Sequence, residues 1–284
     1  MPETVMDLEF LAHLPAQRDL LKRVLARYAP DERVLGLMLY GSLAQGQGDE
    51  FSDIDLNILA NPAHHSELIA EAPATAAGFG RPLYTFRDRD DPAQFYAYYD
   101  CHVKLDLDFM LPGRIGVYVE RRNHRVFKDV TGELAQAVER AALLPERFVP
   151  DFADLAALDA MFWIRCTDIA TKTVRGEFWH ACHAVERLRG ETLPSLASYL
   201  DGLRPIGYRR IEKRVSSDWL TGWEATIARP ERDSVLAALA ALIACYTRLR
   251  DTLAEQTDLS FGLASEDLLR RRLLELGVPL ALPA

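Results

Sequence analysis

Membrane-length apolar runs, secretion-signal features and paired cysteines are all missing from this sequence. No apolar stretch approaches the about 20 residues that cross a bilayer. The first residues, Met1–Asp7, are acidic and lack the basic, then apolar, layout of a signal peptide. The four cysteines are widely spaced, and no Cys-x-x-Cys pair indicates a zinc site or a disulfide framework. We therefore expect a cytoplasmic protein with no membrane segment.

Basic residues are also fewer than acidic residues. Lysine and arginine number 33 against 42 aspartates and glutamates, which gives a net charge of −9. Nonspecific nucleic-acid binding depends on lysines and arginines that neutralise phosphates, so this balance disfavours nucleic acid as a partner. It is compatible with a small or cationic ligand. The composition, 49% hydrophobic and 26% charged over 284 residues, is that of a globular protein with one large or two modest domains.

The N-terminal half mixes strand and helix patterns. Helical apolar spacing runs through Leu8–Tyr28, and Pro73 is expected to end a short helix at Ser66–Ala72. His102–Leu111 alternates between polar and apolar residues, as a half-buried strand does. We expect residues 114–127 to form a further strand or hairpin. The other expected elements are the strands Arg33–Tyr40, Asp53–Ala60 and Pro82–Arg87 and the helix Gly132–Ala142.

Long helical patterns replace the strands from about Asp151. The expected boundary is Pro145–Pro150, which separates a first domain, residues 1–147, from a second, residues 148–284. The predicted fold class is α+β: a small mixed or antiparallel sheet flanked by helices, followed by an all-α helical bundle. The expected helices of the second domain are Phe152–Val174, Phe178–Arg189, Leu193–Leu203, Tyr208–Thr221, Arg232–Leu253 and Glu266–Leu276.

The most informative stretch is residues 41–56, where a Gly-Ser turn joins two apolar strands. Alternate residues of a strand share a face, so Asp53 and Asp55 are expected to lie side by side. Neighbouring carboxylates repel each other unless a cation lies between them, and Mg²⁺ prefers carboxylates together with phosphate oxygens and water. Gly41 and Ser42 offer backbone N–H groups and a hydroxyl to phosphate oxygens. The pattern therefore indicates a metal-assisted site for a phosphorylated ligand.

This stretch resembles the signature of the nucleotidyltransferase superfamily related to DNA polymerase beta, written G-S-x-x-x-G followed by S-D-I-D-L. Gly41, Ser42 and Gly46 match its first part, and Ser52–Leu56 matches its second. Many members carry arginine just before the second glycine, where this sequence has Gln45. The resemblance covers the N-terminal half of the chain and implies that the first domain is a nucleotidyltransferase catalytic domain.

A looser resemblance concerns the helical half. Lys172–Trp179, which reads as a helix–glycine–helix corner, resembles the helical domain that follows the catalytic domain in aminoglycoside and lincosamide antibiotic nucleotidyltransferases. The resemblance implies that the second domain binds the substrate. It also implies that Lys172 and Arg175 reach the triphosphate of the donor.

In the superfamily a third aspartate, on a neighbouring strand, completes the metal site. Lys104–Phe109 is the only later strand-like segment with acidic residues on one face. By analogy with the family's apolar-Asp-apolar pattern we choose Asp106, and Asp108 is the alternative because it shares that face. Lys104 lies on the same face and is suited to offset the negative charge or to contact a phosphate.

The resemblance also implies roles for these residues. Asp53 and Asp55 would bridge two Mg²⁺ ions, and Asp106 would hold the ion nearest the acceptor. The residues that would contact the donor, ATP or another NTP, are Gly41, Ser42, Ser52 and Lys172. The candidate general bases for the acceptor hydroxyl are Asp108, Asp159, Asp168 and Glu177.

The implied activity is transfer of a nucleoside monophosphate, AMP from ATP, onto a hydroxyl of a small molecule, with release of pyrophosphate. An aminoglycoside or lincosamide antibiotic is the acceptor that the two-domain layout suggests. Two alternatives stay open: transfer onto a protein or a tRNA, and a non-catalytic, antitoxin-like module that only binds nucleotide. Clustered carboxylates without a metal are energetically unfavourable, which disfavours the non-catalytic module. No motif indicates the preferred NTP or the oligomeric state.

Overall fold

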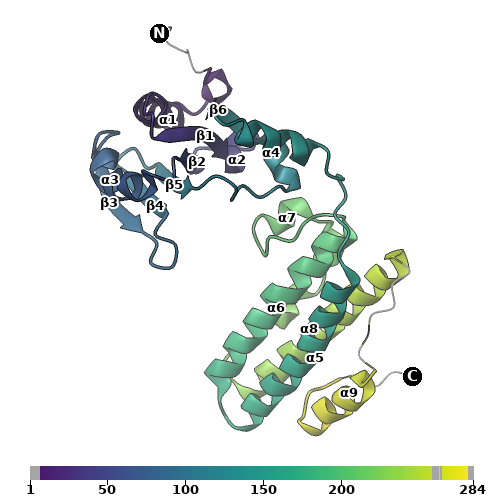
Figure 1. Ribbon diagram of the computed structural model, residues 1–284. Coiled ribbons are helices and arrows are strands. Elements are labelled where there is room, and N and C mark those ends of the chain that lie inside the picture. The colour runs from purple at the N-terminus through teal and green to yellow at the C-terminus, as the bar shows by residue number, and fades with distance from the viewer. Residues whose placement is uncertain (1–6, 258–261, 263, 281–284) are drawn as a thin grey trace. The chain divides into compact units, whose positions relative to one another are not determined.

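The computed structural model describes residues 7–257, 262 and 264–280 of the chain. The chain divides into two compact units, unit 1 (Met1–Pro145) and unit 2 (Glu146–Ala284) (Figure 1). Unit 1 holds a mixed six-stranded sheet with helices and unit 2 is helical, so the predicted α+β class is confirmed. None of the described helices has the length and apolar character needed to cross a membrane. The acidic start of the chain, residues 1–6, lies outside the described residues.

The sheet of unit 1 has the strand order β3-β4-β5-β2-β1-β6. β2 and β5 run parallel, and every other neighbouring pair is antiparallel. The strands are β1 (Val34–Tyr40), β2 (Ile54–Ala60), β3 (Pro82–Arg87), β4 (Gln94–Tyr99), β5 (Lys104–Met110) and β6 (Arg125–Asp129). The helices are α1 (Pro15–Tyr28), α2 (Gly41–Ala44), α3 (His65–Ala77) and α4 (Glu133–Ala142), with 3-10 turns η1 (Glu9–Leu11) and η2 (Val119–Asn123).

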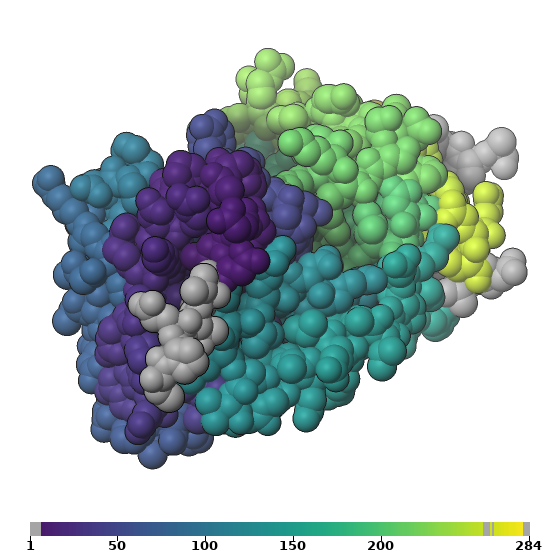
Figure 2. All heavy atoms as spheres, turned by 90° about the horizontal axis from the view of Figure 1, so that it is seen from above, coloured from purple at the N-terminus to yellow at the C-terminus, as the bar shows by residue number. Residues whose placement is uncertain are grey.

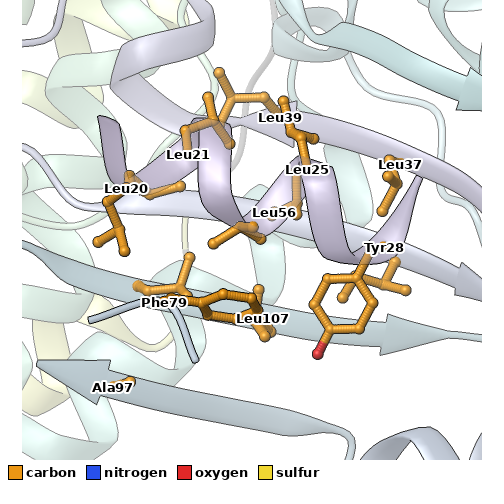
Figure 3. Close-up of a cluster of buried hydrophobic side chains, with 14 of the residues drawn as sticks. Leu20, Leu21, Leu25, Tyr28, Leu37, Leu39, Leu56, Phe79, Ala97 and Leu107 are labelled. Carbon is orange, nitrogen blue, oxygen red and sulfur yellow. The ribbon is translucent and has the colours of Figure 1, made fainter. Parts of the chain in front are cut away.

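Helix α1 covers one face of this sheet. Its leucines recur at helical spacing, so one stripe of the helix is apolar and packs on the strands. Leu21 and Leu25 lie in one buried cluster with Leu39 of β1, Leu56 of β2 and Leu107 of β5 (Figure 3). The other side of α1 is exposed, and its dark purple atoms belong to the surface in Figure 2. The polar residues that alternate with the core residues of β2 and β5 therefore lie on the opposite face of the sheet.

Pro73 lies inside α3 and does not end it, so the predicted end of this helix is wrong. Proline has no N–H group, which leaves the carbonyl of Ile69 without its helical donor. The Arg87 guanidinium donates to that carbonyl over 2.6 Å. Because the freed carbonyl has this partner, the helix continues to Ala77.

Two further parts of unit 1 differ from expectation. Strand β4 was not predicted, because tyrosines at Tyr96 and Tyr98 alternate with buried Phe95 and Tyr99 and so mask the contrast between its two faces. The region 114–127 forms no hairpin: it contains η2 and only the first residues of β6.

Unit 2 packs its long helices around one apolar core. Its helices are α5 (Phe152–Val174), α6 (Phe178–Leu200), α7 (Ile211–Arg214), α8 (Arg232–Thr257) and α9 (Glu266–Glu275), with 3-10 turns η3 (Ser217–Leu220) and η4 (Trp223–Thr226). The side chain of Asp151 caps α5 by accepting a hydrogen bond from the Ala153 N–H. Gly176, with φ +79°, separates α5 from α6, as the sequence predicts.

Two helix predictions in unit 2 are wrong. The segments predicted as separate helices, Phe178–Arg189 and Leu193–Leu203, form one helix, α6, because Leu188, Leu193 and Leu196 continue the same buried stripe. The predicted helix at 208–221 is broken into α7 and η3. The two pieces are separated at Val215, which has an extended backbone conformation.

Candidate functional site

The sheet register brings acidic residues of β2 and β5 together. The two strands are parallel, and Asp55 pairs directly with Asp106. Asp55 also pairs with Tyr40, the last residue of β1. The residues next to the two aspartates, Ile54 and Leu105, are fully buried in the α1 core. Asp55, Asp106 and Tyr40 therefore share the face of the sheet opposite α1.

Lys104 links two of the carboxylates on this face. Its Nζ lies 2.9 Å from Oδ2 of Asp53 and 3.0 Å from Oδ2 of Asp106. Burial disfavours the ammonium, but the hydrogen bonds to Asp53 and Asp106 outweigh it and hold the pKa of Lys104 above its usual value. The structure thus places a cation between Asp53 and Asp106, the arrangement that two neighbouring carboxylates require.

The two candidate third ligands, Asp106 and Asp108, are both half-buried. Burial raises the pKa of the Asp106 carboxyl, Lys104 opposes the shift, and nearby Asp53 adds to it. Oδ1 of Asp106 is buried and has no hydrogen-bond partner. Burial also raises the pKa of Asp108, whose Oδ2 accepts a 3.1 Å hydrogen bond from the Asn57 amide. Asp106 therefore has a buried oxygen with bonding capacity left over, directly beside Asp55.

The turn after β1 is built against Asp55. Gly41 has φ +74°, a conformation that favours glycine. A Cβ added to Gly41 would lie 2.1 Å from Oδ2 of Asp55. The absence of a side chain at Gly41 is therefore what lets the carboxylate and the turn approach each other.

A second set of contacts holds the loop that leads into β2. The hydroxyls of Ser42 and Ser52 are both buried and lie 3.1 Å apart, and Ser52 Oγ also bonds the carboxylate of Asp49 over 3.0 Å. Gln17, a buried side chain of α1, donates to the carbonyls of Glu50 over 3.1 Å and Ser52 over 3.4 Å. Sequence reasoning missed Gln17; its only signal was a polar residue on the apolar side of α1.

The end of α2 borders a basic cavity of about 280 Å³. Gln45 and Gly46 form one side, and Arg122, His124 and Arg125 form the other. Burial and then the nearby Arg121 lower the pKa of His124 to about 4, and its Nδ1 has no hydrogen-bond partner. At the position where many superfamily members carry arginine, basic side chains from the η2–β6 segment thus lie around Gln45.

The candidates in unit 2 are dispersed. Lys172 lies 3.7 Å from the carboxylate of Glu177, so each neutralises the other at the α5–α6 corner. Asp159 is buried and accepts hydrogen bonds from Tyr246 Oη over 2.9 Å and from Arg250 over 3.2 Å. These contacts give Asp159 a structural role inside the bundle. Asp168 and Arg175 are exposed on unit 2.

The acidic face is suited to a divalent cation in its donor chemistry. Carboxylate oxygens are the ligands that Mg²⁺ prefers, and the spare Oδ1 of Asp106 is one of them. Two of the three predicted ligands already share one cationic partner, the Lys104 ammonium. Within the described ranges no three His, Cys, Asp or Glu side chains are gathered as a ready metal site. If Mg²⁺ binds, Asp53, Asp55 and Asp106 would hold it, and it would supply the neutralising charge that the Lys104 ammonium supplies to Asp53 and Asp106 in this structure.

Comparisons with known proteins find similarity among solved structures. Neither a protein-family model nor a curated protein matches the chain. Among solved structures the chain is similar to an aminoglycoside 6-adenyltransferase from Bacillus subtilis, with a TM-score of 0.46 and 12% sequence identity over 92% of this chain and 97% of that chain. A likeness of this size carries no functional argument, so function is inferred from the site residues.

Proposed function

We propose that the protein is a metal-dependent nucleotidyltransferase, which moves AMP from ATP onto a hydroxyl of a small molecule and releases pyrophosphate. The observation that carries the proposal is the pairing of Asp55 with Asp106 beside the Gly41 turn, with Asp53 and Asp106 around a single cation. Mg²⁺ prefers carboxylate and phosphate oxygens as ligands, and the backbone N–H groups of a glycine turn bind phosphate, so an acidic cluster next to such a turn suits a triphosphate with Mg²⁺. In this proposal residues 1–147 form the catalytic domain and residues 148–284 the substrate-binding domain.

The reaction is an in-line displacement at the α-phosphorus. The acceptor oxygen forms a new bond to phosphorus, the bond from phosphorus to the β-phosphate oxygen breaks, and pyrophosphate leaves with the negative charge. The acceptor proton passes to a base, for which we assign Asp108, because burial raises the pKa of its carboxyl above the usual value and so makes it a better proton acceptor. Bound Mg²⁺ would be held by Asp53, Asp55 and Asp106 and would supply neutralisation of the charge on the phosphates.

The residues around the turn hold the donor in this proposal. Ser42 and Ser52 fix the two loops against each other, and the Ser42 hydroxyl and the backbone after Gly41 bind the terminal phosphates. Catalysis of this kind is mostly positioning and electrostatics, so small displacements of the loops lower the rate.

For the acceptor we propose an aminoglycoside or lincosamide antibiotic. Support comes from the negative charge of the protein, −9 overall, and from the acidic side chains around Asp106, which attract amino groups. A cytoplasmic location agrees with this substrate class.

The test is a transfer assay with the full chain, Mg²⁺, each labelled NTP and a panel of aminoglycosides and lincosamides. We expect pyrophosphate release that requires one of these compounds, and a mass increase of one nucleoside monophosphate on it. Asp53→Asn and Asp55→Asn should each lower the rate at least about 10²-fold without loss of folding. Asp100→Asn, on the exposed turn before β5, is the matched control. Label on protein or RNA instead of a small molecule would overturn the proposed acceptor, and full activity of either variant would overturn the metal assignment.

A further inference from the structure

Four aromatic side chains form a partly exposed strip on β3 and β4, which we name the aromatic platform: Tyr84, Phe86, Tyr96 and Tyr98. Tyr84 and Tyr98 stack with ring centroids 5.6 Å apart and an angle of 8° between the rings. Phe86 and Tyr96 stack with centroids 6.0 Å apart. Tyr84 and Phe86 remain 55% and 51% exposed, so about half of their surface is open to a ligand.

The register places the platform on the face that carries the acidic residues. Tyr96 pairs directly with Asp106, and Tyr98 pairs with Lys104. In an antiparallel sheet, directly opposite residues project to the same side. The next strand continues the row, because Phe86 pairs with Tyr96 and Tyr84 with Tyr98. The platform therefore starts beside Asp106 and extends away from it across β4 and β3.

The strand order separates the platform from the phosphate turn. The Gly41 turn follows β1, and the order β1-β2-β5-β4-β3 puts the acidic residues of β2 and β5 between that turn and the platform. In an in-line displacement the attacking and leaving oxygens lie on opposite sides of the phosphorus. With pyrophosphate leaving toward Gly41 and Ser42, the acceptor hydroxyl must approach from the β4 side. We propose, on the basis of the function proposed above, that the aromatic platform binds the rings of the acceptor.

Charge and spacing define the class of acceptor. The Lys104 ammonium already lies 5.6 Å from the centre of the Tyr96 ring, within the distance at which an aromatic face attracts a cation. The carboxylates beside Tyr96 attract cations as well, and neighbouring strands are about 5 Å apart. The Tyr96 ring already contacts Lys104 and Phe86. An acceptor with a hydroxyl on one ring at the edge of Tyr96 and an amine-bearing second ring against the exposed sides of Tyr84 and Phe86 matches this surface. We therefore assign the platform to a cationic, multi-ring polyhydroxylated compound.

The test measures binding without chemistry. The full chain, with Mg²⁺ and the non-reactive donor α,β-methylene-ATP, is titrated calorimetrically with kanamycin. We expect the double variant Tyr84→Leu/Phe86→Leu to raise the Kd for kanamycin at least 10-fold and to leave the Kd for the donor analogue unchanged. Tyr84→Phe keeps the ring and should bind as the wild type does. Thr85→Ala, on the same strand but on the other face, is the matched control.

The outcomes separate this inference from the proposed function. A double variant that binds kanamycin as tightly as the wild type, or a wild type that binds the donor analogue but not kanamycin, would overturn the platform assignment alone. No binding of the donor analogue by the wild type would overturn the proposed function. If the double variant does not fold, ring-proton NMR of the wild type decides: kanamycin should shift the Tyr84 resonance, identified with Tyr84→Phe, and no shift would contradict the inference.

Discussion

The ammonium of Lys104 lies 2.9 Å from the carboxylate of Asp53. The same ammonium contacts Asp106, so a single lysine neutralises two of the three predicted metal ligands. A bound divalent ion and Lys104 would therefore compete for the same carboxylate oxygens. This relationship makes the metal hypothesis testable through stability, without any knowledge of the acceptor.

Replacing Lys104 with methionine keeps most of the length of the side chain and removes its charge. In the presence of a chelator we expect Lys104→Met to lower Tm, because Asp53 and Asp106 lose their cation. Added Mg²⁺ should then raise Tm more in the variant than in the wild type, since no ammonium has to be displaced. Thermal denaturation with and without Mg²⁺ measures both effects. An equal Mg²⁺ response in the two proteins would contradict competition at this site.

Gly41→Ala should damage the site in two ways. The left-handed backbone at φ +74° is unfavourable for alanine by about 1 kcal/mol, and the new Cβ collides with Asp55. We expect a total loss of about 2–4 kcal/mol in the free energy of unfolding and loss of transfer activity. The control Gly113→Ala has φ +78° with open space around it, so only the backbone strain applies. Urea denaturation should rank the two variants, and equal losses would argue against the contact with Asp55.

Gln17→Leu removes the amide that holds the loop leading into β2. The carbonyls of Glu50 and Ser52 lose a buried donor, which should cost about 1–3 kcal/mol of stability. Hydrogen exchange at residues 49–52 should become faster, and affinity for ATP should fall because Ser52 is less firmly placed. Gln47→Leu, an exposed neighbour, should change stability by no more than about 0.5 kcal/mol. If hydrogen exchange at residues 49–52 is the same in the Gln17 variant as in the wild type, Gln17 does not hold this loop in place.

His124 should make the stability of the protein sensitive to acid. Its pKa is lowered to about 4 in the fold, against 6.5 for an ordinary histidine, so between these values the unfolded chain binds a proton that the folded chain does not. Stability is therefore fully present above pH 6.5 and falls as the pH drops toward 4, by an amount on the order of 3 kcal/mol. Urea denaturation across this range should show a shallower fall for His124→Phe, with exposed His13→Phe as control. Parallel curves for the wild type and the His124 variant would contradict a buried neutral imidazole.

The predicted helices and strands that hold the site agree with the structure for a simple reason. β5 alternates between buried and half-buried residues, and β1 and β2 are nearly continuous apolar runs. Gly41 follows β1 and Pro112 follows β5 closely, so these strands can be recognised without tertiary information. The errors arise where distant groups intervene. Pro73 stays inside α3 because Arg87 of β3 donates a hydrogen bond to the carbonyl of Ile69, which proline leaves without its helical donor. β4 was not predicted because tyrosines, rather than clearly polar residues, occupy its less buried face.

The amino-acid sequence by itself determined the pattern of acidic residues, since alternation within a strand fixes which side chains share a face. It therefore predicted that Asp53 and Asp55 share a face beside Gly41, whereas Asp106, with Asp108 as the alternative, came from the resemblance to the superfamily. Only the tertiary structure decided their partners: the parallel register that pairs Asp55 with Asp106, the Lys104 ammonium between Asp53 and Asp106, and Gln17 under the loop. Register and side-chain contacts between distant segments depend on packing of the whole sheet, and no local pattern specifies them.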